Sequence, residues 1–326
     1  MTVKTVAYHA LQQGISLAIL GAVHGNERCG TEAIHRLIQE LDQGDVVLKS
    51  GTLLLMPIAN PAAYEQGVRY VERNLNRSLY PKNTKVHYED HLDPILCAFL
   101  DQADVLLDLH SYSSHGDAFI FLDGSNPKEI EYASALGVHD FVYGWTDAFG
   151  NEHDKEAQGT TEYAELQGAL AVTLECGHHH DAEAANVGYR AIIKSLIHFD
   201  MLDETCSAAL HAKAESAAIT TSKHRCVKMQ SVYYREEGAT LVKPWRHFDF
   251  VSKNEPIAYF ENGTVLLAPE NGYVVLPKLN ASTGDEWFYF GVAADLPFGH
   301  QRAEKHATKM HSHTHSYIAQ GTELAI

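Results

Sequence analysis

Three apolar runs, each followed directly by a histidine or a glutamate, constrain this chain more than any other feature. The runs read ISLAILGAV, VLLDL and ALAVTL, and they end immediately before His24, His110 and Glu175. Stretches with a helical spacing of apolar residues lie between such runs, which is typical of buried parallel strands that alternate with helices. We therefore expect an α/β fold with a mainly parallel, mixed sheet and helices on both of its faces.

The pattern changes along the chain of 326 residues, which is long enough for two domains. Strand and helix patterns alternate over residues 1–203, whereas residues 204–222 are small and polar and predict a linker. Short runs rich in β-branched and aromatic residues, broken by Gly, Pro and Asn, fill residues 223–298 and predict a small all-β domain. A His-rich tail, residues 299–326, completes the expected organisation.

Composition narrows the classes of partner. The formal net charge of −17 disfavours nucleic acid, whose binding depends on Lys and Arg at phosphates, and it also disfavours an anionic membrane surface. No apolar run approaches the roughly 20 residues of a membrane helix, and the first residues lack the pattern of a secretory signal. Five irregularly spaced cysteines without a CxxC pair favour reduced thiols in the cytoplasm. We expect a small-molecule substrate and leave a homo-oligomer open.

His24, Glu27 and His110 are candidate ligands of one metal ion. His24 and Glu27 are three residues apart on a turn that leads into a predicted helix, so both can face one point. Such an H-x-x-E pair alone is usually a surface histidine near a helix start, but His110 at the end of another strand changes its meaning. Two histidines and one carboxylate, with a fourth position left for water, suit a catalytic zinc ion. Asp108 falls inside the predicted strand and is not counted as a ligand.

Two further segments carry groups suited to hydrolysis. A glutamate at the end of a buried strand is costly without a partner, and Glu175 could serve as general base toward a water on the metal. The alternative for Glu175 is an ordinary salt bridge at a strand end. Arg69, Asn76 and Arg77 lie in a basic stretch of an acidic chain and could bind a carboxylate or a developing oxyanion, or could belong to a solvated loop.

These motifs together resemble the succinylglutamate desuccinylase/aspartoacylase family of the zinc carboxypeptidase clan. The resemblance rests on V-H-G-N-E, on R-x6-N-R, on D-L-H and on T-L-E-C-G in that order, over roughly residues 15–200. It implies a zinc carboxypeptidase-like fold with a C-terminal domain of the barrel-sandwich type. It also implies roles: zinc ligands His24, Glu27 and His110, the catalytic base Glu175, the carbonyl-polarising Arg69, and the carboxylate-binding pair Asn76 and Arg77.

The sequence departs from the family pattern at two positions. Asn74 stands where the family usually has the aspartate of D-L-N-R, and we expect it to support the loop without touching substrate. Glu165 stands where aspartoacylases carry an arginine that helps to hold a dicarboxylic substrate, which argues against N-acetylaspartate. The acidic segment 152–165 would instead favour a cationic or neutral group. Tyr289 is a candidate for a C-terminal residue that reaches the substrate.

The function expected from these residues is that of a zinc-dependent amidohydrolase. It would cleave the amide bond of an N-acyl amino acid or a related small amide, with Glu175 activating the water on one zinc ion per chain. A zinc carboxypeptidase acting on short peptides is the main alternative, and a non-catalytic metal-binding module is a weaker one. The run His178–His180 is interpreted as a polar loop, and the histidines of the tail as a solvated segment.

Overall fold

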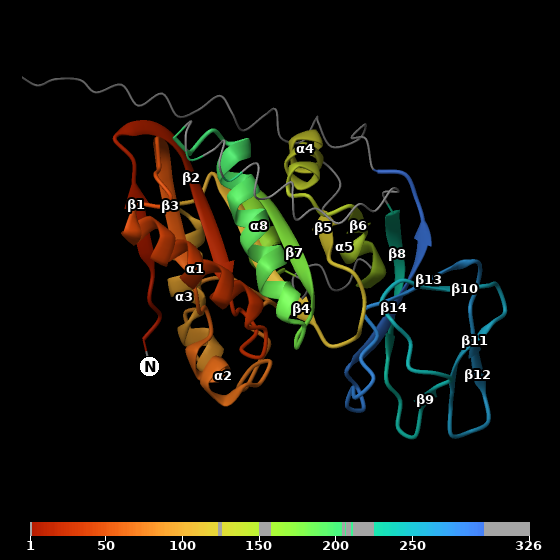
Figure 1. Ribbon diagram of the computed structural model, residues 1–326. Helices are drawn as coiled ribbons and strands as arrows, with labels where there is room; N and C mark the ends of the chain where they lie inside the picture. Colours follow the sequence, from red (N-terminus) through yellow and green to blue (C-terminus); the bar gives the residue numbers. More distant parts are fainter. Residues whose placement is uncertain are drawn as a thin grey trace, which may run out of the picture.

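One large sheet organises the molecule. The computed structural model describes residues 2–122, 126–149, 158–203, 206, 210 and 225–296. Within these ranges, eleven strands form a mixed sheet in the order β1-β3-β2-β4-β7-β5-β6-β8-β14-β13-β10 (Figure 1). The first part of this sheet is covered by α1 and α8 on one side and by α3 on the other (Figure 1). The expected linker lies outside the described residues apart from Cys206 and Leu210, and the whole of the expected tail, residues 299–326, lies outside them.

The bounds of the elements are as follows. The strands of the large sheet are β1 (Val6–His9), β2 (Gln12–Gly21), β3 (Ser50–Met56), β4 (Val105–Tyr112), β5 (Phe119–Leu122), β6 (Asp140–Tyr143), β7 (Leu170–His178), β8 (Arg225–Tyr234), β10 (Asp249–Val251), β13 (Gly272–Val275) and β14 (Glu286–Ala293). A second, small sheet contains β9 (Thr240–Leu241), β11 (Pro256–Tyr259) and β12 (Val265–Leu267). The helices are α1 (Cys29–Gln43), α2 (Pro61–Gln66), the 3-10 helix η1 (Tyr88–His91), α3 (Asp93–Leu100), α4 (Pro127–Ala135), α5 (Trp145–Phe149), α7 (Thr160–Leu166) and α8 (Ala182–His198).

The directions of the strands confirm the mixed sheet predicted from the sequence. Neighbours β3, β2, β4 and β7 are parallel to one another, whereas β5 runs antiparallel to β7. The part of the chain after residue 225 is as rich in β-strands as predicted, and four of these strands extend the main sheet. This continuity arises because β8 pairs in parallel with β6, and β14, β13 and β10 follow in antiparallel order. The chain after the expected linker therefore shares a sheet with the chain before it.

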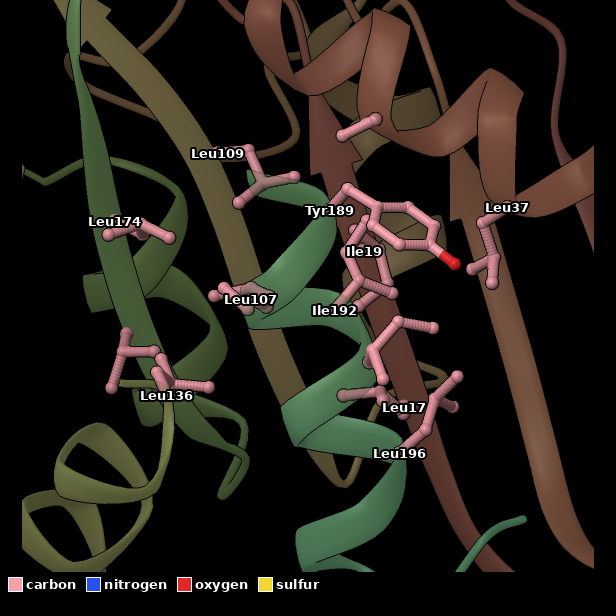
Figure 2. Close-up of a cluster of buried hydrophobic side chains, with 14 of the residues drawn as sticks. Leu17, Ile19, Leu37, Leu107, Leu109, Leu136, Leu174, Tyr189, Ile192 and Leu196 are labelled. Carbon is pink, nitrogen blue, oxygen red and sulfur yellow. The ribbon is translucent and has the colours of Figure 1, made fainter. Parts of the chain in front are cut away.

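Apolar side chains alternate between the two faces of the sheet, as expected for strands buried on both sides. Along β2, Leu17 and Ile19 belong to a core with residues of α1 and α8. Ala18 and Leu20 belong to a second core with residues of α3 and α7. Figure 2 shows side chains of α8 lying over the strands in the first core. Burial of both faces fixes the positions of the strand ends that carry the polar residues.

Two strands extend further than the sequence indicated. We expected His110 and Glu175 just after their strands, but β4 continues to Tyr112 and β7 to His178. The prediction of the strand ends was wrong because β5 pairs with β7 from the other side, with Phe119 opposite Glu175, and so continues the ladder. As a result His110 and Glu175 are direct neighbours across β4 and β7. No described helix is both long and apolar enough to cross a membrane.

Candidate metal centre and active site

A tight turn after β2 carries the first two candidate ligands. The backbone N–H of Glu27 donates to the carbonyl of His24 at 3.1 Å, which closes the turn just before α1 begins at Cys29. Gly25 in this turn has no room for a side chain, since a Cβ there would lie 2.0 Å from the carbonyl carbon of Ala63 in α2. Close packing against α2 therefore explains the glycine of the H-G-N-E motif.

The three predicted ligands meet at one point. His24, Glu27 and His110 each offer a ligand atom, and these atoms lie within 4.8 Å of one another. The Oε1 atom of Glu27 is 2.8 Å from Nδ1 of His24, and its Oε2 atom is 3.0 Å from Nδ1 of His110. At most 3% of each residue is exposed. Among the described residues this is the one such group of histidine, cysteine and acidic side chains.

Neighbouring groups hold these ligands in place. Asp108 accepts a hydrogen bond from Nε2 of His110 at 2.8 Å, and Asn74 accepts one from Nε2 of His24 at 2.9 Å. The backbone N–H of Ser111 donates to Oε2 of Glu27 at 3.0 Å. The contact of Asp108 with His110 could have been predicted from D-L-H, because alternate residues of a strand lie on the same face. The sequence offered no comparable signal for the contact of Asn74, which lies fifty residues from His24.

Glu175 lies beside the ligand group and has the properties of a proton-transfer residue. It is 8% exposed, and its Oε2 atom is buried without a hydrogen-bond partner. Burial and the nearby charge of Glu27 raise the pKa of Glu175 to about 8. A cation held by the ligands would oppose this shift and favour the ionised carboxylate. A carboxylate with an adjustable pKa near neutrality suits general acid and base catalysis.

The residues present fit a zinc ion. Two buried atoms in this region, Nδ1 of His24 and Oε2 of Glu175, have no hydrogen-bond partner. Burial, followed by the charge of Arg69, lowers the pKa of His24 to about 4, so this imidazole is neutral and its lone pair is available. Burial would lower the pKa of His110, but Asp108 and Glu27 raise it well above its usual value, so a metal ion would displace a proton there. Two imidazoles and a carboxylate form a common catalytic zinc set.

A cavity of about 480 Å³ adjoins this group. Two of its lining residues contact the candidate ligands: Arg69 donates to Oε1 of Glu27 at 2.8 Å, and Asn74 accepts from His24. The cavity is lined by Arg69, Tyr70, Asn74, Arg77, Ser113, Tyr234, Lys278, Leu279, Asn280, Ala281, Gly284, Asp285 and Glu286. Residues 69–77 and residues 278–286 therefore line the same cavity.

The predicted carboxylate-binding pair is divided. Arg77 lines the cavity, where it donates to Oε1 of Glu286 at 3.1 Å and packs over the ring of Trp145. Asn76 is not a lining residue, and its side-chain oxygen accepts from the backbone N–H of Thr160 at the start of α7, at 2.8 Å. The structure therefore places Arg77 where a ligand can reach it and gives the oxygen of Asn76 a different partner.

Residues of the C-terminal strands complete the charges around the cavity. Glu286 of β14 accepts from Arg77, from Lys278 at 3.4 Å and from the hydroxyl of Tyr289 at 2.8 Å. Tyr289, our candidate for reaching the substrate, is 1% exposed and is not a lining residue. Burial and then Arg69 lower the pKa of Lys278. Glu286 and Lys278 were missed because the sequence does not reveal which β-rich run faces the site.

Two other positions singled out in the sequence have defined places. Glu165 lies on α7 and is not a lining residue of the cavity, and the acidic segment around it is outside the described residues from 150 to 157. His179 was interpreted as part of a polar loop, but its Nδ1 is 2.9 Å from the hydroxyl of Ser111, next to His110. It therefore borders the ligand group, whereas His180 is exposed.

Comparison with known proteins places the chain in a family. A family model, the succinylglutamate desuccinylase/aspartoacylase catalytic domain, matches residues 13–194, more than half of the chain. The chain belongs to this family. The match covers all four motifs on which the resemblance rested, and the family explains why they occur in that order.

Individual relatives of the succinylglutamate desuccinylase/aspartoacylase family match shorter stretches. A probable aspartoacylase from Nostoc sp. is 32% identical over 129 residues, which are 37% of this chain and 43% of the relative. The aspartoacylase of Xenopus tropicalis is 31% identical over 121 residues, 33% of this chain and 38% of the relative. These matches span less than half of each relative, so they support the family without settling the substrate.

Two solved structures share the fold over most of the chain. A succinylglutamate desuccinylase/aspartoacylase from Rhodobacter sphaeroides aligns with a TM-score of 0.71 at 19% identity, over 91% of this chain and 90% of that one. The ectoine utilization protein EutE (DoeB) from Ruegeria pomeroyi, in its product-bound form, aligns with a TM-score of 0.68 at 20% identity, over 88% of both chains. Both alignments cover a larger share of this chain than residues 13–194, so the shared fold extends beyond the part that the family model matches.

Proposed function

We propose that this protein is a zinc-dependent amidohydrolase that removes the acyl group from an N-acyl amino acid or a related small amide. The observation that carries the proposal is the convergence of His24, Glu27 and His110 beside a buried, unpartnered carboxylate of Glu175. Membership of a family with aspartoacylases and succinylglutamate desuccinylases supports this reaction class. Five free cysteines fit a cytoplasmic location for this activity.

Each residue of the site has a role in this proposal. His24, Glu27 and His110 would hold the zinc ion, which would act as a Lewis acid toward an amide carbonyl and a water molecule. Glu175 takes a proton from the attacking water and passes it to the leaving nitrogen. Arg69 lines the cavity next to Glu27, where its guanidinium can stabilise the negative charge that develops on the carbonyl oxygen.

The cavity supports a small substrate with a carboxylate. Its volume of about 480 Å³ is that of a small-molecule site. Arg77 presents a guanidinium to the cavity and can bind a carboxylate through two hydrogen bonds. The segment from Lys278 to Glu286 lines the same cavity and covers one side of it, which favours a compact N-acyl amino acid over a longer peptide.

The decisive experiment replaces Glu175 with glutamine, which keeps the shape of the side chain and removes its proton-transfer ability. We expect Glu175→Gln to retain one zinc ion per chain and to lose at least about 100-fold in kcat on the best substrate of an N-acyl amino acid panel. Zinc content is measured by elemental analysis, and the same panel includes dipeptides to test carboxypeptidase activity.

A matched control uses an exposed glutamate on α4. Glu131→Gln makes the same change at a residue that does not line the cavity, and it should leave both zinc content and kcat unchanged. Full activity of Glu175→Gln would refute the role of this carboxylate. Wild-type protein that binds no zinc would refute the proposed metal dependence.

A further inference from the structure

The two candidate ligand histidines are supported by different chemical groups. Nε2 of His110 lies 2.8 Å from a carboxylate oxygen of Asp108, whereas Nε2 of His24 lies 2.9 Å from the amide oxygen of Asn74. In both histidines the other ring nitrogen, Nδ1, faces Glu27. A group behind a ligand histidine controls both its orientation and how strongly it donates electrons to a metal.

A backbone contact identifies the atom of Asn74 that faces His24. The N–H of Asn76 donates to Oδ1 of Asn74 at 2.9 Å. Because a backbone N–H can only donate, the atom that it meets must be the oxygen of the amide and not its nitrogen. The same oxygen is the atom that lies next to Nε2 of His24. The orientation of this amide therefore follows from the backbone.

This orientation also fixes the protonated nitrogen of His24. An amide oxygen can only accept, so Nε2 of His24 must carry the hydrogen. In a neutral imidazole the other nitrogen then holds a lone pair, and Nδ1 of His24 is buried without a hydrogen-bond partner. It lies 2.8 Å from Oε1 of Glu27, which is another acceptor. Asn74 thus aims a vacant lone pair at the ligand group.

His110 has a more strongly electron-donating support. Asp108 is fully buried, and its Oδ2 accepts from Nε2 of His110 and also from the hydroxyl of Thr160. A carboxylate pulls more strongly on the imidazole N–H than a neutral amide does, so it makes the opposite nitrogen a better donor to a metal. The ligand group is therefore unequal, with His110 as the stronger donor and His24 as the weaker one.

We propose that Asn74 sets the strength of metal binding in this protein by supporting His24 with a neutral amide in place of a carboxylate. The inference rests on the proposed metal site at His24, Glu27 and His110. Its consequence is a metal ion that is held less tightly, and left more electron-poor, than it would be between two carboxylate-supported histidines.

The test exchanges these supports while keeping their shapes. Asn74→Asp should lower the Kd for zinc about 10-fold and slow zinc loss to excess chelator, and Asp108→Asn should raise the Kd by a similar factor. Kd is measured by competition with a chromophoric chelator, and loss is followed after addition of EDTA. Asn74→Asp can keep both hydrogen bonds, because a carboxylate oxygen accepts from His24 and from the N–H of Asn76 as the amide oxygen does, so the variant should fold.

A control separates the hydrogen bond from simple addition of charge. Ser113 lines the same cavity and is exposed, so Ser113→Asp adds one negative charge to the cavity by a side chain that makes no bond to His24. Tighter zinc binding in Asn74→Asp and little change in Ser113→Asp is the expected result. An unchanged zinc Kd in Asn74→Asp, or an equal decrease of the Kd in Ser113→Asp, would overturn this inference but not the proposed function. Wild-type protein without a zinc site would overturn the proposed function as well.

Discussion

Two irregular segments line the cavity, and different kinds of interaction hold them. Residues 67–87 contribute Arg69, Asn74 and Arg77, and residues 276–285 contribute Lys278. Neither segment contains a helix or a strand. Buried charges anchor the first segment, whereas backbone hydrogen bonds to neighbouring strands anchor the second. Backbone outside helices and strands lacks regular hydrogen bonds of its own, and these two segments are held in place by different kinds of contact.

Three acidic residues after the first segment hold it. Glu89 is fully buried and accepts from the backbone N–H groups of residues 71, 72 and 73 at 2.7, 3.2 and 3.1 Å. Arg73 donates to Asp90 at 2.7 Å and to both carboxylate oxygens of Asp93 at 2.6 Å. Because Arg73 lies next to Asn74, this network fixes the backbone that supports His24.

The second segment depends on the strands around it. The N–H of Lys278 donates to the carbonyl of Trp287 at 2.7 Å, and the N–H of Gly284 donates to that of Arg235 at 2.8 Å. Arg235 also donates from its side chain to the carbonyl of Ala281. The hydrogen bond from the guanidinium of Arg235 to residues 276–285 therefore goes to a backbone carbonyl and not to a carboxylate. The segment should therefore tolerate loss of one side chain better than residues 67–87 do.

Replacing the central arginine of the first segment should have the largest effect. Arg73→Met leaves Asp90 and Asp93 buried with less positive charge to compensate them, so we expect the free energy of unfolding to fall by about 3–5 kcal/mol. Urea denaturation measures this change. The matched substitution in the other segment, Arg235→Met, removes one side-chain hydrogen bond and should cost about 1 kcal/mol. Equal costs for the two variants would contradict the difference between the segments.

The sequence predicted one side of this site much better than the other. His24, His110 and Glu175 follow apolar runs, Glu27 is three residues after His24, and the C-terminal parts of neighbouring parallel strands lie at one side of the sheet. Their convergence could therefore be expected from local pattern alone. The basic stretch singled out Arg69 and Arg77, the family resemblance gave them roles, and both residues line the cavity.

Contacts between distant parts of the chain could not be predicted. Glu286 meets Arg77 across 209 residues, and its place depends on which β-rich run joins the main sheet and in which register. A shift of one residue in β14 would turn Glu286 to the opposite face, and no sequence pattern excludes that shift. The contact of Asn74 with His24 was missed for a related reason, because the path of an irregular segment depends on buried charges that attach to it from elsewhere.

Glu286 contacts both segments through Arg77 and Lys278, so its replacement should have an effect of intermediate size. Burial raises the pKa of Glu286, but Arg77 and Lys278 outweigh it and hold that pKa well below the usual range. A carboxylate of this kind stabilises the fold above the pKa of the unfolded chain, about 4.3, and its contribution declines as pH falls below that value. We expect Glu286→Gln to cost about 2 kcal/mol at pH 7 and clearly less at pH 3.

Urea denaturation of wild type and variant at several pH values tests this prediction. Glu131→Gln on α4 serves as the control, and its free energy of unfolding should match that of wild type at each pH. Glutamine still accepts from the hydroxyl of Tyr289, so the cost of this variant reports the lost charge. A cost of Glu286→Gln that stays constant from pH 7 to pH 3 would contradict stabilisation of this carboxylate by Arg77 and Lys278.

The smallest effect should come from the first hydrogen bond of the second segment. The N–H of Leu276 donates to Nδ1 of His247 at 3.1 Å, and the buried imidazole stacks on Phe119 of the main sheet. Burial, with a further contribution from Arg225, lowers the pKa of His247 well below its usual value. The folded protein therefore resists a proton that the unfolded chain accepts below about pH 6.5, and stability is lost as pH falls through that value.

Replacement by glutamine keeps an acceptor for Leu276 and removes the titration. We expect the free energy of unfolding to fall by about 1 kcal/mol more in wild type than in His247→Gln between pH 7 and pH 5.5, because a single suppressed protonation changes stability by at most about 1.4 kcal/mol per pH unit. Hydrogen exchange at Leu276 should accelerate over the same interval in wild type, while exchange at residues 71–73, held by Glu89, stays slow. If the free energy of unfolding had the same pH dependence in both proteins, protonation of His247 would not destabilise the second segment. Its stability would then depend on backbone hydrogen bonds such as that from Lys278 to Trp287 of β14.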